Sequence, residues 1–223
     1  MAEVKVKVAS GAKEAPARPR ARPVKAASKD ADLVRERRGL LVAAAVRVFK
    51  EKGFHETTVR DIGREAGMTQ GTIYNYVGSK DDILYLVCDQ IVSEYQEETR
   101  KALDNSADPH TRVRSAVRAL CEGMVKRQDE VLLTYQNSHL LDARSRRVIF
   151  ARVEEFVGMF QAILTDAARE LGRPLPDPHF AANAITFFPT MLALRRWSLK
   201  ARHRPSELTE WLVDFLVRGL GFD

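Results

Sequence analysis

Apolar residues recur at helical spacing along most of the chain after residue 31. The first stripe predicts a helix from Ala31 that ends at Gly53, where glycine takes the left-handed C-terminal position at no steric cost. Two short helices are predicted near 59–66 and 69–76, and a long helix from Lys80 to about Leu103. The later stripes predict helices over about 109–128, 130–142, 143–171, 178–201 and 206–220. No segment has the pattern of a sheet strand, so the predicted fold class is all-α.

The first thirty residues differ from the rest of the chain. Residues 1–30 hold no Phe, Tyr, Trp, Leu or Ile, so they cannot bury enough surface to order themselves. Eight Lys and Arg stand there against three Asp and Glu, which gives +5 of the chain's net +6. Such a tail, with Arg18, Arg20 and Arg22 among its charges, can attract an anionic polymer. The alternative is a solubilising leader.

Composition excludes several classes of protein. The chain has 223 residues, 45% of them hydrophobic, yet no apolar run approaches the roughly 20 residues of a membrane span. The N-terminus has no continuous apolar stretch, so no secretory signal is expected. The two cysteines, Cys88 and Cys121, lie far apart and are interpreted as small core residues. These features favour a cytoplasmic protein without membrane association.

Common motifs for catalysis or metal binding do not occur in the chain. It has no nucleophile-elbow, phosphate-loop, dinucleotide or zinc-protease motif. Its five histidines are scattered, without a partner at metal-ligand spacing. We therefore expect no cofactor, no metal and no enzymatic activity. An all-α enzyme whose site assembles only in space stays open as an alternative.

A pair of short predicted helices follows Gly53. Thr58-x-x-Asp61 has the form of a capping box, in which two side chains satisfy the free N–H groups at a helix start. It predicts a helix from Val59 with room for two turns before Gly67. Gly67 permits a tight turn, and Thr69 can cap the next helix. Two short helices joined in this way are typical of the DNA-binding helix-turn-helix.

The second short helix carries side chains suited to base edges in the major groove. Gln70 and Asn75 can bond adenine bidentately. Thr69 and Thr72 can offer a methyl group to thymine or a hydroxyl to any base, and Gly71 permits close approach. The alternative is a polar surface helix in an ordinary helical bundle.

Residues beside that helix suit other parts of DNA. Tyr74 and Lys80 suit phosphates, one through a hydroxyl group and one through charge. Arg60 can fork onto guanine. Thr58 and the free N–H groups beside it form a small anion site at a helix start.

These residues together carry a family resemblance. Over about residues 35–84 the chain resembles the N-terminal domain of the tetracycline-repressor-like (TetR) transcriptional regulators. The matching positions are Phe49, Gly53, Phe54, Thr57 to Ile62, Ala66 to Met68, Gly71 to Tyr74 and Ser79 to Leu84. The chain departs from the family at Tyr76-Val77, where His-Phe is more usual, and at Gly78, where a basic residue is common. Tyr76 is included with the DNA-binding residues on this resemblance.

The resemblance implies a division into a basic tail (1–30), a three-helix DNA-binding domain (31–85) and a larger helical domain for effector binding and dimerisation (86–223). It also implies a homodimeric repressor that binds an inverted repeat in double-stranded DNA. A small apolar or amphipathic effector would release it by moving the helix after Ser79. An acyl thioester is one candidate, suggested by Arg195, Arg196 and Lys200 near aromatic residues.

Candidate effector residues in the larger domain are aromatic, apolar or polar side chains near the predicted stripes: His139, Phe156, Phe160, Phe187, Phe188 and Met191. A filled core is the alternative for each. The last two predicted helices carry more apolar surface than one face needs, which predicts a dimer contact through Leu194, Trp197, Trp211 and Phe215. A protein-interaction module that has lost DNA binding is a second alternative function.

Overall fold

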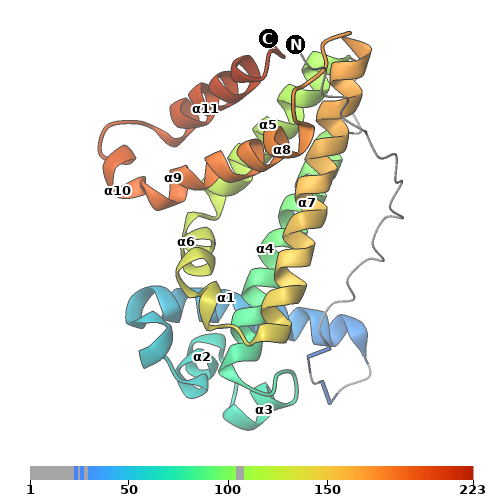
Figure 1. The fold of residues 1–223 in the computed structure, drawn as a ribbon. Helices are drawn as coiled ribbons and strands as arrows, with labels where there is room; N and C mark the ends of the chain where they lie inside the picture. The colour runs from blue at the N-terminus through green and yellow to red at the C-terminus, as the bar shows by residue number, and fades with distance from the viewer. Residues whose placement is uncertain (1–22, 25, 28–29, 104–107, 223) are drawn as a thin grey trace, which may run out of the picture.

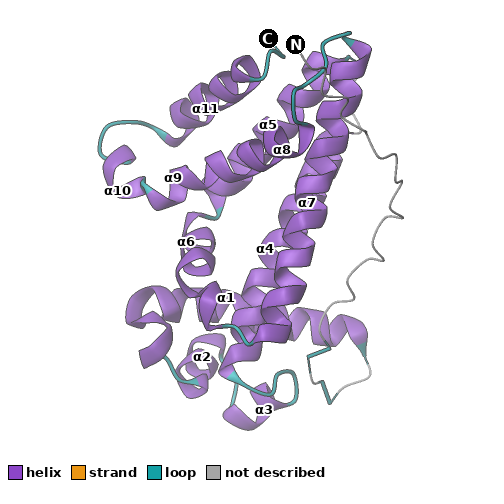
Figure 2. Ribbon diagram, viewed as in Figure 1, coloured by secondary structure: helices purple, strands orange, loops and turns teal. Residues whose placement is uncertain are grey.

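The computed structural model describes residues 23–24, 26–27, 30–103 and 108–222. Every regular element within these ranges is helical, as Figure 2 shows, so the predicted all-α fold class is confirmed. The elements are α1 (Ala31–Glu56), α2 (Val59–Ala66), α3 (Gln70–Tyr74), α4 (Lys80–Leu103), α5 (Pro109–Lys126), α6 (Gln128–Asn137), η1 (Ser138–Leu140), α7 (Ala143–Glu170), α8 (Pro178–Phe187), η2 (Phe188–Thr190), α9 (Met191–Leu194), α10 (Arg196–Leu199) and α11 (Pro205–Gly219).

The first three helices form a compact group at one end of the molecule (Figure 1). Asp30 caps α1 by accepting from the N–H groups of two residues in its first turn. The helical conformation is interrupted at Gly53, with φ 77° and ψ 161°, which is the predicted stop. A final turn follows, and Phe54 folds back so that its ring centroid lies 5.1 Å from that of Phe49. Both rings are buried between α1 and its neighbours.

Two long helices, α4 and α7, run side by side away from this group and carry the rest of the fold (Figure 1). The bounds of α4 are those predicted from the sequence. Helix α5 begins with Pro109 after the N-cap Asp108, whose carboxylate accepts from the N–H of Thr111. Helices α8 to α11 close the far end against α5 and α7. Cys88 and Cys121 are unbonded and fully buried, as predicted for core residues.

The prediction of one continuous helix over 178–201 is wrong. The chain there forms α8, the short 3₁₀ helix η2, α9 and α10. Pro189 lies inside η2 and cannot donate a backbone hydrogen bond, so a regular α-helix is interrupted at this point. Arg195 makes a second break, with φ −106° and ψ 13°. The apolar stripe across this stretch did not reveal either interruption.

The basic tail falls mostly outside the described residues, since 1–22, 25 and 28–29 are not among them. Within it, Val24 is half-buried and packs against the core. The division of the chain at residues 30 and 85 stays a prediction.

Candidate nucleic-acid interface and apolar cavity

The start of α2 is fixed by the predicted capping box. The Thr58 hydroxyl accepts from the Asp61 N–H at 3.1 Å, and the Asp61 carboxylate accepts from the Thr58 N–H at 3.0 Å. The carboxylate also accepts from the Thr58 hydroxyl and forms an ion pair with Lys52 at 3.0 Å. Hydrogen bonds from Thr58, and then the Lys52 ammonium, hold the pKa of Asp61 well below its usual range. Thr58 is thus committed to the cap, although its side chain is exposed.

The turn between α2 and α3 brings the two helices unusually close. Gly67 adopts the left-handed conformation, with φ 66° and ψ 29°, and its N–H donates to the end of α2. A Cβ placed on Gly63 would lie 2.5 Å from Ile73 Cδ1 and 2.8 Å from the Met68 carbonyl oxygen. Gly63 is therefore required for this approach, and sequence reasoning missed it. The signal was a glycine inside an eight-residue helix.

Most of the residues predicted to read DNA are exposed on α2, α3 and the positions beside them: Arg60, Thr69, Gln70, Gly71, Tyr74 and Asn75. Tyr74 is 39% exposed. The hydroxyl groups of Thr69 and Thr72 lie 2.8 Å apart, and Thr69 also accepts from the Thr72 N–H. These two hydroxyl groups are therefore partly engaged within α3. Among the described residues, Arg60, Gln70 and Tyr74 have no side-chain hydrogen-bond partner and remain available to DNA.

Two predicted DNA ligands, Tyr76 and Lys80, make contacts within the protein. Tyr76 is only 9% exposed and belongs to the core, because it lies past the end of α3 on its inner side. The Lys80 ammonium donates to the carbonyl oxygens of Phe54 at 2.7 Å, His55 at 3.2 Å and Thr57 at 2.8 Å. It also lies 4.4 Å from the centroid of the Phe54 ring. Its three donors are occupied by the end of α1, so this arrangement favours a structural role over a phosphate contact.

A clamp made by Arg38 on α1 was not visible in the sequence. Its Nε donates to the Tyr76 carbonyl oxygen at 3.1 Å, and its Nη2 donates to the Val24 carbonyl oxygen at 2.6 Å. The Ala27 N–H donates to the carbonyl oxygen of Asn75, the C-cap of α3, at 2.7 Å. The segment before α1 is thus bonded to the end of the helix predicted to read DNA.

The two predicted domains meet at a shared ion pair. Asp129 on α6 accepts from Lys50 of α1 at 2.7 Å and also from Arg196 of α10. Burial raises the pKa of Asp129, but the bonds and charges of Lys50 and Arg196 outweigh it, so the net shift is downward. One carboxylate therefore joins α1, α6 and α10.

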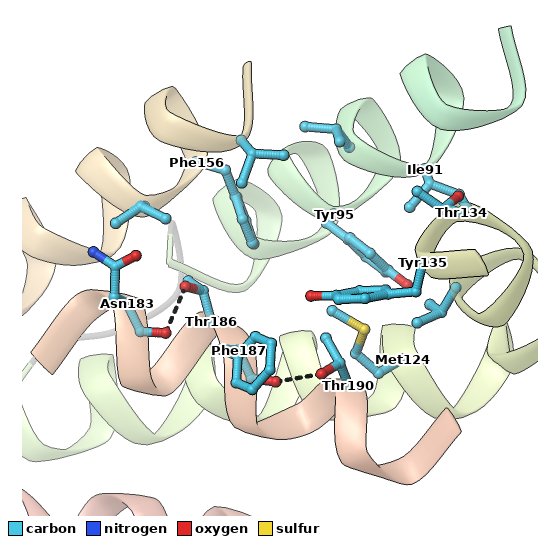
Figure 3. Close-up of a pocket in the computed structure, with 14 residues that line it drawn as sticks. Ile91, Tyr95, Met124, Thr134, Tyr135, Phe156, Asn183, Thr186, Phe187 and Thr190 are labelled. Carbon is cyan, nitrogen blue, oxygen red and sulfur yellow. Dashed lines mark hydrogen bonds between the residues drawn. The ribbon is translucent and has the colours of Figure 1, made fainter. Parts of the chain in front are cut away.

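A cavity of about 180 Å³ lies between α4, α5, α6, α7 and α8 (Figure 3). Side chains of Tyr95, Phe156 and Phe187 converge on it from α4, α7 and α8. No Asp, Glu, His, Lys, Arg or Cys is among its lining residues. The buried Tyr95 hydroxyl has no hydrogen-bond partner among the described residues. Burial raises the pKa of Tyr95, so this hydroxyl stays protonated and can donate.

Two of the six predicted effector residues, Phe156 and Phe187, line this cavity. Phe160 is buried behind Phe156, with ring centroids 5.3 Å apart. The other three do not line the cavity and are exposed: His139, Phe188 and Met191. Sequence reasoning did not single out Tyr95 or Tyr135, because both lie on apolar stripes that read equally well as filled core.

Aromatic side chains are unusually exposed over α8 to α11. Trp197 is 73%, Trp211 55% and Phe215 64% exposed, and the Phe188 and Phe215 ring centroids lie 6.3 Å apart. Leu194, the fourth residue predicted at a dimer contact, is half-buried. Within the described ranges no group of His, Cys, Asp and Glu could hold a metal ion. None of the described helices is both long and apolar enough to span a membrane.

Comparison with known proteins gives matches over both parts of the chain. Residues 41–85 match the model for bacterial regulatory proteins of the tetR family, and residues 106–220 match that for the tetracyclin repressor-like C-terminal domain. The HTH-type transcriptional regulator HbdR of Aromatoleum sp. (strain CIB) is 31% identical over 196 residues, which cover 87% of this chain and 85% of HbdR.

Two further matches are to a transcriptional repressor and to a regulator bound to DNA. The HTH-type transcriptional repressor KstR2 of Mycobacterium tuberculosis is 30% identical over 126 residues, covering 55% of this chain and 60% of KstR2. The crystal structure of AibR in complex with isovaleryl coenzyme A and operator DNA matches with a TM-score of 0.66 and 18% identity. That match covers 79% of this chain and 96% of AibR, and it shows a common fold.

Proposed function

The chain belongs to the TetR family of bacterial regulatory proteins and is a ligand-responsive DNA-binding transcriptional regulator, and from this premise we propose that it is a homodimeric repressor. Its two recognition helices bind the two halves of an inverted-repeat operator, and an effector in the cavity of the larger domain releases them. We propose that residues 31–85 bind DNA, and that residues 86–223 bind the effector and form the dimer. A bacterial operator lies in the cytoplasm, and the proposed site of action is therefore there.

The observation that carries this proposal is the position of α4. Its first residue, Lys80, holds the end of α1 through three carbonyl oxygens. Farther along the same helix, Ile91, Val92 and Tyr95 line the cavity. A ligand that displaces the middle of α4 therefore acts on the same rigid element that supports the DNA-binding helices, which is the physical requirement for coupling between two sites.

The proposed DNA contacts divide into two kinds. Gln70 and Arg60 are exposed and have no side-chain partner in the described part of the chain, and we assign them to base edges, where a bidentate contact discriminates between bases. The Tyr74 hydroxyl is assigned to a phosphate, which positions the protein without specifying sequence. Thr69 and Thr72 offer methyl groups to thymine. In a dimer, half-site centres should lie near one helical turn, about 34–36 Å, or a multiple of it.

The proposed effector is a compact apolar group that carries one hydrogen-bond acceptor. A cavity of about 180 Å³ lies below the usual range for drug-sized ligands, roughly 300–1,000 Å³. It resembles in size an engineered apolar cavity of about 150 Å³ that binds benzene. An unpaired buried donor costs about 1–3 kcal/mol, so a carbonyl group that reaches the Tyr95 hydroxyl would recover part of that cost. An acyl thioester supplies both features, and AibR was crystallised in complex with one, isovaleryl coenzyme A.

Homodimerisation is proposed through α8 to α11. The exposed Trp197, Trp211 and Phe215 lie on these elements, and large exposed apolar surface marks a protein contact. Aromatic residues are also the ones enriched at the centres of such contacts. A two-fold dimer would use the same patch on both copies.

A gel shift of the purified full chain on its own upstream region tests the proposal. We expect a specific shift that unrelated DNA does not compete away, and a loss of the shift on addition of an acyl thioester, with isovaleryl coenzyme A as the first probe. Mass spectrometry of small molecules that co-purify with the protein should identify a compact acyl or aromatic compound. Absence of sequence-specific DNA binding would overturn the proposal.

A further inference from the structure

We propose that the apolar cavity selects neutral carbonyl compounds and rejects carboxylates. Three glutamates outside its lining make this selection: Glu94, Glu98 and Glu130. An acyl group would thus be recognised as an ester or thioester and not as the free acid. This inference rests on the proposed function, because it takes the cavity as the effector site. It adds residues that decide which chemical form of the effector enters.

The hydroxyl group that an effector would meet in the cavity belongs to a closely packed ring. The Tyr95 hydroxyl is buried and has no hydrogen-bond partner among the described residues. A Cβ placed on Gly123 of α5 would lie 3.1 Å from the Tyr95 ring, and the guanidinium carbon of Arg127 lies 5.8 Å from the ring centroid. Figure 3 shows the ring among the side chains that line the cavity. These contacts leave Tyr95 little room to turn its hydroxyl elsewhere.

The cation beside this ring is already bound to two carboxylates. The Nη2 and Nη1 of Arg127 donate to Glu98 at 2.7 and 3.0 Å, and its Nε donates to Glu94. The Arg127 side chain is only 11% exposed, and it is not among the residues that line the cavity. Arg127 therefore supplies no counter-charge to a ligand.

The charge around Tyr95 is negative. Four charged groups act most strongly on its hydroxyl: Arg127, Glu94, Glu98 and Glu130. One positive and three negative groups give a net charge of −2. Lys126 acts on Glu98 more weakly than Arg127 does, and it does not line the cavity. On α7, Arg152 is paired with Asp89, so this pair adds no net charge.

A carboxylate and a neutral carbonyl group differ sharply in such a site. A carboxylate would lose its water, find no cation in the lining and meet the negative charge behind Tyr95. A neutral carbonyl oxygen has no charge to desolvate, and it can accept a hydrogen bond from the Tyr95 hydroxyl. The cavity therefore favours the neutral form.

Only the acyl end of a larger effector has to meet this selection. Asn183 and Phe187 line the cavity and are also exposed, so they mark its opening to solvent. A volume of about 180 Å³ holds a compact group, and a polar carrier attached to it would stay outside.

The first test compares two ligands of similar shape on the full chain. Acetophenone carries a carbonyl oxygen and a methyl group where benzoate carries two oxygens and a negative charge. The affinity of each is measured by ligand-observed nuclear magnetic resonance at neutral pH, without DNA. We expect acetophenone to bind and benzoate to bind at least about 100-fold more weakly, because burial of an uncompensated charge is costly.

The second test changes the charge and leaves the lining intact. Glu98→Gln and Glu130→Gln each remove one negative charge near Tyr95. The matched control is Glu97→Gln, since Glu97 lies on the same helix as Glu98 but is paired with Arg100 and Lys101. We expect the ratio of acetophenone to benzoate affinity to fall about 3- to 10-fold in the first two variants and to stay unchanged in the control.

Stability is verified by thermal melting in circular dichroism. Glu98→Gln weakens an ion pair with Arg127, whereas Glu130 has no side-chain partner among the described residues. Glu130→Gln therefore carries the test if Glu98→Gln does not fold.

The outcomes separate this inference from the proposed function. Equal affinities for the two ligands, or binding of neither, overturn the selection. An unchanged ratio in the Glu98 and Glu130 variants, or an equal fall in Glu97→Gln, overturns the role of these glutamates. Operator binding is measured independently by the gel shift of the unmodified chain, and its absence would overturn the repressor proposal while the selection between the two ligands stands.

Discussion

The two ends of the molecule differ in the kind of side chain that they expose to solvent. Around α2 and α3 the large aliphatic residues Ile62 and Ile73 are completely buried, and most of the exposed side chains are polar or charged. Over α8 to α11, aromatic rings such as Trp197 and Phe215 are exposed, and a cavity lies between the neighbouring helices. A polar ligand such as DNA needs a closely packed frame that positions donors. An apolar ligand or a second copy of the chain needs surface that the monomer leaves uncovered.

At the DNA-binding end, we expect the largest loss of stability from a substitution of Gly63. Gly63→Ala places a Cβ against Ile73 and the Met68 carbonyl, and the backbone at the turn cannot yield without moving α3. We expect a loss of about 3 kcal/mol in the free energy of unfolding and loss of specific DNA binding. Urea denaturation and gel shifts measure both. The control is Gly39→Ala in α1, where a Cβ has open space, and it should gain about 0.5–1 kcal/mol. Equal stability of the two variants would contradict the close approach.

At the opposite end, Phe215→Ser should leave the monomer folded and weaken the dimer. A central aromatic residue in an interface is worth about 2 kcal/mol or more, so we expect the dimer dissociation constant to rise at least about 30-fold by analytical ultracentrifugation. Phe150→Ser is the matched control, since Phe150 is 57% exposed but lies on α7, away from this patch. A similar shift in both variants would place the dimer contact elsewhere.

Lys80→Met distinguishes support of α1 from contact with DNA. Removing the ammonium leaves the carbonyl oxygens of Phe54, His55 and Thr57 without their common donor. We expect a loss of about 1.5–3 kcal/mol in stability, with DNA affinity falling equally for all sequences. Thermal melting and anisotropy measure the two effects. A variant that melts like the unmodified chain yet binds DNA weakly would restore Lys80 as a phosphate ligand.

Gln70→Ala and Tyr74→Phe separate specificity from positioning within α3. Loss of a bidentate base contact should cost about 1–3 kcal/mol on the preferred operator and relax the base preference at one position. Tyr74→Phe should weaken binding to all sequences alike. Selection from a randomised half-site, followed by sequencing, measures the preference of each variant. A changed base preference in Tyr74→Phe would reverse the two assignments.

The smallest expected effect concerns the joint between the two ends, which is Asp129 with its ion pairs to Lys50 and Arg196. Asp129→Asn removes the charge that holds Lys50 and Arg196. We expect effector-induced release of DNA to weaken by about 0.5–2 kcal/mol of coupling, with smaller changes in either affinity alone. Because the pKa of Asp129 is lowered, the contribution of its ion pairs to the free energy of unfolding is fully present above the ordinary pKa of about 3.9. This contribution is lost as the pH falls through the lowered pKa of the folded protein. Titrations of effector with and without operator measure the coupling, and unchanged coupling would exclude Asp129 as the joint.

The sequence was most informative where local chemistry decides the structure. The Thr58–Asp61 box and the stop at Gly53 each act within a few residues, and both occur as predicted. Ser79 and Asp82, at the start of α4, have the same spacing as Thr58 and Asp61. The Asp82 N–H donates to the Ser79 hydroxyl, but the Asp82 carboxylate accepts from the Gly78 N–H at 2.8 Å.

Contacts between distant residues were not predictable in the same way. Lys80 is 26 residues from Phe54, and Arg38 is 38 residues from Tyr76. A basic residue near a DNA-binding motif reads as a phosphate ligand until the packing of α1 against α4 is known. The cavity presents the same difficulty, because Phe156 and Phe160 share one stripe of α7, and only the packing of α8 decides which of them faces empty space.

Helix α4 has a mechanical consequence that follows from its length alone. At 1.5 Å per residue, the fifteen residues from Lys80 to Tyr95 span about 22 Å, so the helix is a rigid lever that joins the cavity wall to the DNA-binding helices. Tilting this lever by about 5° swings its DNA-proximal tip by roughly 2 Å. In a dimer with a two-fold axis, the DNA-proximal ends of the two α4 helices would change their separation by about 4 Å. This is a little more than the 3.4 Å rise per base along one DNA strand. A ligand the size of one aromatic ring, far smaller than the operator, can therefore shift the two recognition helices away from the spacing of the major grooves.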